Sequence, residues 1–166
     1  MTFFTDGEKK LLLSAGQVVI GFSGGADSTL LLFETNKFLN ESDSNKKLKA
    51  LHINHQTQSK SDKWEIHCKK FCEQNRINFQ AEKINIDIKG EGFEAAARSA
   101  RLAIFNSFSE NSIIMLGHHL DDQIETVLFR ILRGTGMKGL SGMKRQSELG
   151  TKTILRPLIN LEKKEI

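Results

Sequence analysis

Short apolar runs and longer amphipathic segments alternate along the chain. The apolar runs have the length of strands buried on both faces, and they lie at residues 17–22, 48–53, 77–86, 112–117 and 151–159. Helical spacing of apolar positions marks residues 5–14, 28–39, 61–75, 93–108 and 121–132. This alternation predicts an α/β fold: a doubly wound parallel sheet of about five strands with helices on both faces. In such a sheet, ligands bind at the carboxyl ends of the strands.

The most regular helical pattern lies at residues 121–132. Its apolar side chains recur at near-ideal spacing and form one stripe, made of Ile124, Val127, Leu128, Ile131 and Leu132. An apolar stripe on one side of a helix is typical of a helix that covers a core. The pattern therefore predicts that this stripe packs the helix against the sheet.

The composition is that of a globular domain, and we expect it in the cytoplasm. The 166 residues are 39% hydrophobic and 27% charged, which suits one domain with its own core. No apolar run approaches the roughly 18 residues that span a bilayer, and the N-terminus has no secretory pattern. Cys68 and Cys72 lie with Trp64 and Phe71 on the apolar face of the helix at 61–75, so we interpret them as packing residues. The net charge of +4 weakly favours an anionic partner, either a nucleotide or a nucleic acid.

The stretch GFSGGADS, residues 21–28, follows the first predicted strand and leads directly into a helix. Glycines let the backbone lie close to a ligand, and successive N–H groups at the start of a helix bind anions. The hydroxyl groups of two serines add further donors. We therefore predict a phosphate-binding loop formed by Ser23, Gly24, Gly25, Ala26, Asp27 and Ser28. A tight turn with Asp27 and Ser28 as helix caps is the alternative.

Asp27 is unusual in such a loop, because a carboxylate repels phosphate unless a cation lies between them. We predict that Mg²⁺ is this cation. Three further acids, Asp121, Asp122 and Glu125, begin the helix at 121–132, at the carboxyl edge of the predicted sheet. They are suited to hold Mg²⁺, with Asp27 and Asp122 as the metal ligands, or to attract an amine substrate. The alternative is that acids simply favour a helix N-terminus.

The loop SGGADS resembles the S-G-G-x-D-S loop of the ATP pyrophosphatase superfamily, whose members split ATP between the α and β phosphates. Longer segments narrow the resemblance. FEAAARSARLAIF from Phe93, LGHHLDDQIETVLFRILRGTGMKGLSGM from Leu116 and ILRPLI from Ile154 are similar to motifs of the tRNA(Ile)-lysidine synthetase family. The similarity runs from Val18 to Ile159, which is nearly the whole chain.

This resemblance implies an adenine nucleotide alpha hydrolase-like (Rossmann-like) fold and the use of ATP with Mg²⁺. The other substrates that it implies are free L-lysine and tRNA(Ile) with a CAU anticodon. ATP would adenylate the C2 oxygen of the anticodon cytidine and release pyrophosphate, and the ε-amine of lysine would then displace AMP.

The resemblance also assigns residues. The catalytic residues that it implies are Asp27, Asp121, Asp122, Glu125 and Arg101. Arg101, on a helix face with Glu94 and Arg98, would neutralise phosphate; an exposed ion pair on that helix is the alternative. His52 and Asn54 end the second strand, where the superfamily binds adenosine; an ordinary strand end is the alternative there.

The family pattern further predicts that residues 1–166 are a single N-terminal ATP pyrophosphatase domain. We expect this domain to be incomplete at its C-terminal end and to lack the tRNA-binding domains of the family. Residues 130–147 hold five basic residues, four glycines and no acid. This composition suits either contact with an RNA phosphate backbone or a solvated surface.

Two other functions also fit the loop. One is the ATP pyrophosphatase domain of another synthetase, of the tRNA thiolation or amidotransferase type. No glutaminase segment is recognisable in these 166 residues, and the thiolation enzymes use cysteine pairs that Cys68 and Cys72 do not resemble. The other function is a nucleotide-binding module without catalysis, which a test for pyrophosphate release would identify.

Overall fold

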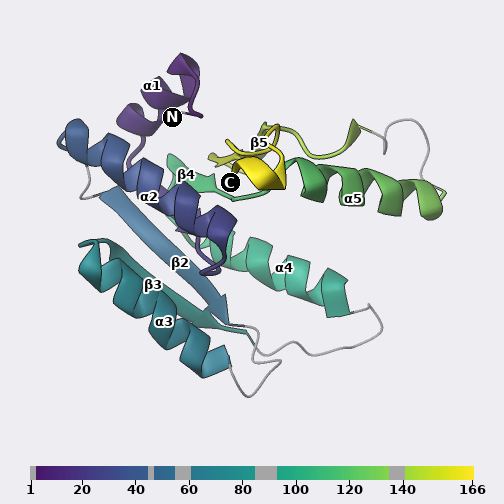
Figure 1. Cartoon of the computed structure of the whole chain (residues 1–166), viewed down its shortest axis with the longest axis horizontal. Coiled ribbons are helices and arrows are strands. Elements are labelled where there is room, and N and C mark those ends of the chain that lie inside the picture. Colours follow the sequence, from purple (N-terminus) through teal and green to yellow (C-terminus); the bar gives the residue numbers. More distant parts are fainter. Residues whose placement is uncertain (1–2, 45–46, 55–60, 85–92, 135–140) are drawn as a thin grey trace.

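The computed structural model describes residues 3–44, 47–54, 61–84, 93–134 and 141–166. Within them, one six-stranded sheet runs in the order β3-β2-β1-β4-β6-β5 (Figure 1). Its strands are β1 (Gln17–Gly21), β2 (Leu48–Asn54), β3 (Asn78–Lys83), β4 (Ser112–Met115), β5 (Gln146–Leu149) and β6 (Lys152–Leu155). The five predicted strands are present and parallel, whereas β5 was not predicted and pairs antiparallel with β6. β5 is a short edge strand whose residues are exposed or half-buried, so it has no apolar run.

Helices cover both faces of the sheet, as predicted. They are α1 (Asp6–Ser14), α2 (Ala26–Glu41), α3 (Ser61–Gln74), α4 (Phe93–Asn106) and α5 (Leu120–Leu132), and a 3₁₀ turn, η3 (Lys163–Glu165), follows near the C-terminus. Successive residues of β1 enter two different cores. Val18 packs in one core with Leu31 of α2, and Val19 packs in the other with Phe105 of α4. The expected α/β class is therefore confirmed.

The prediction that the apolar stripe of α5 packs on the sheet is wrong. Ile124 and Leu128 are more than half exposed, Leu132 is 85% exposed, and no residue of α5 is buried. α5 starts at the carboxyl end of β4 and projects away from the sheet (Figure 1). Polar contacts join it to the segment before β5, where the side-chain amide of Gln123 accepts from the N–H of Met143 and donates to its carbonyl.

The apolar face predicted for α3 is only partly correct. Cys68 and Cys72 are fully buried in the core beneath the helix, as expected, but Trp64 is half exposed. Burial raises the pKa of Cys68 to about 11 and that of Cys72 to about 12, so both thiols stay protonated and unreactive at neutral pH. Among the described helices, none is long and apolar enough to cross a membrane.

An ion pair ties the first helix to the segment before β5. Arg145 donates to both carboxylate oxygens of Glu8, at 2.7 and 2.9 Å, and the N–H of Thr5 donates to the same carboxylate at 2.8 Å. Glu8 is only 5% exposed. Burial acts to raise the pKa of Glu8, but the hydrogen bonds from Arg145 and Thr5 together outweigh it and lower that pKa below its usual 4.5.

Glu8→Gln is expected to destabilise the fold by about 1–3 kcal/mol at pH 7, because it leaves the Arg145 guanidinium without its carboxylate. Because the pKa of Glu8 is lower in the folded state than in the unfolded state, the ionised carboxylate stabilises the fold at pH values above the unfolded-state pKa of about 4.5. This contribution is lost as the pH falls through the lower pKa of the folded state. The difference between wild type and variant should therefore shrink below pH 4.5 in urea unfolding curves. The exposed Glu73→Gln, which removes a partner of Lys69, is the control and should cost under about 1 kcal/mol. A pH-independent difference for Glu8→Gln would contradict this account.

Candidate nucleotide-binding site

The predicted phosphate loop connects β1 to α2 at the carboxyl edge of the sheet. α2 begins at Ala26, two residues earlier than predicted, and its N-cap is Gly25, which makes no side-chain cap hydrogen bond. Asp27 and Ser28 lie in the first turn, so the alternative that they cap the helix is wrong. Free N–H groups at a helix N-terminus attract anions, and here no side chain of the helix occupies them as a cap.

Serine hydroxyls brace the loop from inside. Ser23 Oγ and Ser28 Oγ lie 3.0 Å apart, and the Ser28 hydroxyl donates to the carbonyl of Gly25 at 3.1 Å. The Gly25 N–H donates to Ser23 Oγ at 3.3 Å, which is a long and weak bond. These contacts hold the loop in one shape. Because the Ser28 proton goes to Gly25, the Ser23 hydroxyl donates to Ser28 Oγ, and both hydroxyl groups must turn outward before they can donate to a phosphate.

Gly117, just after β4, lets the two loops meet. A Cβ at this position would lie 3.2 Å from the carbonyl carbon of Asp27 and the nitrogen of Ser28, both of them backbone atoms. A side chain here would push α2 away from β4. The glycine therefore sets the close approach that forms the floor of the site.

A cavity of about 720 Å³ opens beside this loop, at the carboxyl ends of β1, β2 and β4. Its volume is in the range of pockets that enclose nucleotide-sized ligands. Seven of the predicted site residues line it: Ser23, Asp27, Ser28, His52, Asn54, Arg101 and Asp122. The topology therefore brings these seven together from four separate segments of the sequence.

The end of β2 supplies one wall. His52 is buried, and its Nδ1 lies 2.9 Å from the carbonyl oxygen of Phe22; because a carbonyl only accepts, Nδ1 carries the proton. Asn54 is also buried, and its amide donates to Glu65 of α3 at 2.9 Å. Both side chains are therefore fixed in orientation at the place where the sequence predicted an adenosine site.

The three acids of α5 are not equivalent. Asp122 lines the cavity, and its carboxylate accepts from the backbone N–H of His119 at 2.8 Å, so it also caps the helix. Asp121 and Glu125 are exposed and do not line this cavity. The sequence placed all three acids at the same edge, but only one of them faces the pocket.

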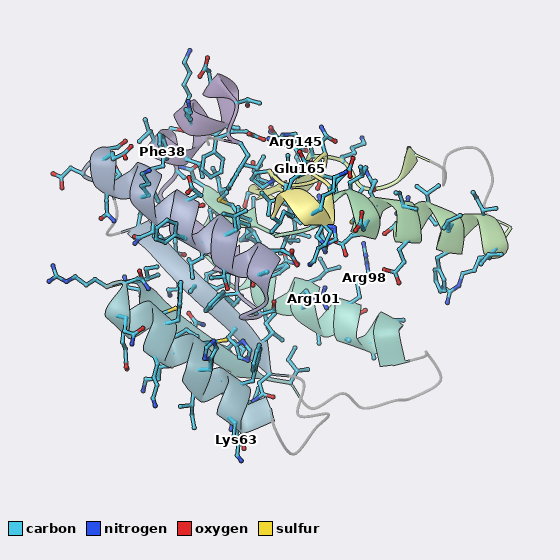
Figure 2. All side chains as sticks on the ribbon, in the orientation of Figure 1. Phe38, Lys63, Arg98, Arg101, Arg145 and Glu165 are labelled. Carbon is cyan, nitrogen blue, oxygen red and sulfur yellow. The ribbon has the colours of Figure 1, made fainter. Side chains whose placement is uncertain are left out.

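Arg101 enters the cavity from α4, where positive charge gathers. Burial lowers the pKa of Arg101 and of Arg156, and the charge of the neighbouring Arg98 lowers both pKa values further, although Arg101 and Arg156 remain charged at neutral pH. Figure 2 shows Arg98 and Arg101 on the side of α4 that faces α5. Among the described residues, neither has an ion-pair partner. The side chain of Glu94, their predicted partner, lies outside the described residues.

His118 lines the same cavity as Arg101 and Asp122. Burial, followed by the charge of Arg156, lowers the pKa of His118 to about 4, so the ring is neutral at physiological pH. Its Nδ1 is buried and has no hydrogen-bond partner among the described residues. The cavity thus offers a neutral ring beside a cluster of cations, an arrangement suited to an anionic ligand.

Lys163 and Trp64 were not predicted as residues of the site. Lys163, in η3, holds the Asp27 carboxylate with its Nζ 2.6 and 2.7 Å from the two oxygens. Trp64 of α3 lines the cavity and donates its indole N–H to the carbonyl of Ser23. Trp64 was assigned to the core because it shares a face with the cysteines. No sequence signal marked Lys163, which is 136 residues away from Asp27.

The basic segment at residues 130–147 is only partly available to RNA. Residues 135–140 lie outside the described residues. Arg145 is held by Glu8, and Arg130 donates to the carbonyl of Gly142 at 3.0 Å. Arg130 and Arg145 already have partners within the protein, so fewer basic side chains of this segment are available to contact RNA than the sequence suggested.

The predicted metal ligands fit Mg²⁺ only in combination with phosphate. Among the described residues, no three acids, histidines or cysteines gather closely enough to form a metal site by themselves. Asp27 and Asp122 each approach the same His119 Nε2, at 3.8 and 3.5 Å. Mg²⁺ is typically held by one or two carboxylates together with substrate phosphates, and these two carboxylates match that pattern.

A parallel sheet with an uncapped helix N-terminus and a cavity at its carboxyl edge defines a nucleotide-binding α/β domain. The chain belongs to the PP-loop domain family, which matches residues 3–166. It is 40% identical over 155 residues to a tRNA(Ile)-lysidine synthase of Pseudomonas fluorescens, covering 93% of this chain and 35% of that protein. A tRNA(Ile)-lysidine synthase of Histophilus somni is 40% identical over 151 residues, covering 90% of this chain and 35% of that protein. The chain thus spans about a third of the length of these relatives.

A solved structure shares the fold. The U34-tRNA thiolase NcsA from Methanococcus maripaludis, with its [4Fe-4S] cluster, superposes with a TM-score of 0.69 at 19% identity, covering 95% of this chain and 59% of that chain. At this identity, the likeness supports the architecture and does not extend to the reaction.

Proposed function

We propose that this domain binds ATP with Mg²⁺ and splits it between the α and β phosphates to adenylate a tRNA base. The base is the anticodon cytidine of tRNA(Ile) with a CAU anticodon, and free L-lysine then forms the C2–N bond of lysidine. The observation that carries the proposal is the uncapped loop at Ser23–Ser28 in a chain about 40% identical to tRNA(Ile)-lysidine synthases. ATP, lysine and tRNA meet in the cytoplasm, where we place the reaction.

In the first step, the C2 oxygen of the cytidine attacks the α phosphorus, and pyrophosphate leaves. The N–H groups at the start of α2 and the hydroxyls of Ser23 and Ser28 would bind the departing phosphates. Arg101 would neutralise charge from the opposite wall of the cavity. Asp27 and Asp122 would hold Mg²⁺, which when bound neutralises phosphate charge.

In the second step, the ε-amine of lysine attacks C2 and AMP leaves with the former C2 oxygen. Asp122, which lines the cavity, would attract the ammonium group of the incoming lysine, and the exposed Asp121 and Glu125 would add negative charge along its approach. The amine must lose a proton before it attacks. The neutral His118 is too weak a base to be assigned this role, since its pKa is about 4.

A tRNA thiolation activity is less well supported. The two cysteines of the chain are Cys68 and Cys72, and both are buried in the core with raised pKa values. Thiolation through a cysteine or an iron–sulfur cluster needs accessible thiolates.

The experiment that tests the proposal is a domain exchange. This chain would replace the matching 155-residue region of the Pseudomonas fluorescens synthase, so that the test does not depend on how much of a longer protein the chain represents. The chimera, incubated with ATP, lysine and tRNA(Ile), should produce lysidine in a digest analysed by mass. The 166-residue chain alone is expected to bind ATP but to form little lysidine. A folded chimera that releases pyrophosphate and makes no lysidine would overturn the proposed substrate.

Asp122→Asn is expected to raise the KM for lysine about tenfold in the same assay, while ATP affinity changes less than twofold. The reason is that only this acid of α5 faces the cavity. Asp121→Asn and Glu125→Gln act from the exposed side and should raise the KM about two- to threefold. Equal effects from all three acids would show that lysine binds on the outer side of α5 instead.

A further inference from the structure

Lys163 reaches the phosphate loop from the far end of the chain. Its ammonium group lies 2.6 and 2.7 Å from the two carboxylate oxygens of Asp27 and 3.4 Å from Nε2 of His119. Asp27 is in the first turn of α2 and lines the cavity. The ammonium group of Lys163 therefore lies against the single acid of the loop, in the region where we propose that phosphate binds.

The segment that carries Lys163 is anchored on both sides. The N–H of Leu120 donates to the carbonyl of Leu161 at 2.9 Å, which joins the segment to the start of α5, and the two lie side by side (Figure 1). Leu161 and Ile166 pack against the main core. The backbone of η3 is thus held beside the pocket, while the half-exposed lysine side chain has a flexible four-carbon stem that lets its ammonium group change partners.

The neighbouring Lys164 shows that this placement is particular to one residue. Lys164 is 78% exposed at its side chain and pairs with Glu162, in its own turn. Both lysines carry the same charge in the same segment. Only Lys163 contacts the loop.

We propose that Lys163 binds the β and γ phosphates of the nucleotide: it pairs with Asp27 in the structure and moves to phosphate oxygens when the nucleotide arrives with its divalent cation. Phosphate bound at the N-terminus of α2 lies beside Asp27, because that residue belongs to the same turn. Two cations on one carboxylate repel each other, so a Mg²⁺ ion held by Asp27 would displace the ammonium group. Asp122, whose carboxylate lies 3.5 Å from the same His119 nitrogen, is the other proposed ligand of the cation, so the phosphate chain is the anion left to receive the ammonium group. The inference rests on the proposed use of ATP.

The test measures binding and needs no tRNA. Calorimetry would give the affinities of ATP, pyrophosphate and AMP, each with Mg²⁺, for the wild-type chain and for Lys163→Met, Lys163→Arg and Lys164→Met. Trp64 is the single tryptophan of the chain and lines the cavity, so its emission is a second readout of occupancy. Melting curves would confirm that each variant is folded.

Lys163→Met is expected to weaken ATP and pyrophosphate about tenfold and AMP less than twofold, because AMP lacks the phosphates in question. Lys163→Arg should keep most of the affinity, and Lys164→Met, which removes the same charge, should bind all three ligands like wild type. Unchanged pyrophosphate binding by Lys163→Met would overturn the inference and leave Lys163 as an ion pair of the fold. An equal loss in Lys164→Met, or no recovery in Lys163→Arg, would also overturn it. If the wild-type chain bound neither ATP nor pyrophosphate, the proposed function itself would fail.

Discussion

Asp27→Asn is expected to slow pyrophosphate release from ATP by about 10²–10³-fold in the lysidine-forming chimera, the size of effect seen when one electrostatic stabiliser is removed from an active site. The carboxylate lies in the first turn of α2 and lines the cavity, where it is one of two candidate Mg²⁺ ligands. Asparagine keeps its shape and loses its charge. ATP affinity is expected to hold or rise, because the repulsion between carboxylate and phosphate disappears.

The measurement is a pyrophosphate-release assay together with ATP binding at several Mg²⁺ concentrations. Asp6→Asn is the matched control, since Asp6 also lies in the first turn of a helix but far from the cavity, at the start of α1. Chelating the divalent cation should reduce the wild-type rate to about that of Asp27→Asn and should change the variant little. A variant rate near that of wild type would remove Asp27 from the metal site.

Gly24→Ala is expected to abolish detectable ATP binding and to destabilise the fold by about 2–5 kcal/mol. Gly24 has a φ of +81°, which costs about 1–2 kcal/mol for an alanine. A Cβ there would also lie 2.7 Å from Sγ of the buried Cys68 and 3.1 Å from Nε1 of Trp64, and overpacking of this kind costs about 1–3 kcal/mol. The loop would have to leave α3 and lose the shape that presents its N–H groups.

Urea unfolding and ATP calorimetry would measure both effects. Gly134→Ala separates the cost of the positive φ from the cost of overpacking, because Gly134 has a φ of +69° and an added Cβ would meet nothing within 4 Å. It should cost only about 1–2 kcal/mol and leave ATP binding intact. Cys68→Ala in the Gly24→Ala background should recover part of the stability, because it removes the closest clash. Equal costs for the two glycine substitutions would show that backbone conformation alone matters.

Much of the site could be predicted from local sequence because its parts are local. The loop Ser23–Ser28 combines a strand end, two glycines and a helix start, and each of these features is set by neighbouring residues. His52 and Asn54 could be placed in the same way, because parallel strands end at one edge of the sheet. The helix begins two residues earlier than predicted, so Asp27 and Ser28 lie in its first turn and the alternative that they cap it is wrong.

The sequence by itself determined five of the six strands, the helices between them, the two-faced sheet and the position of the glycine loop that we propose binds phosphate, since periodicity and turn chemistry act over a few residues. Only the tertiary structure decided which groups meet. Periodicity shows which side chains share a face of α5 but not what covers that face. It therefore predicts that Ile124 and Leu128 pack on the sheet, whereas the structure leaves both exposed. In the same way, one helix start carries Asp122 into the cavity and leaves Asp121 outside it. The contact of Lys163 with Asp27 joins residues 136 positions apart and depends on how the last segment docks beside α5, which no local pattern encodes.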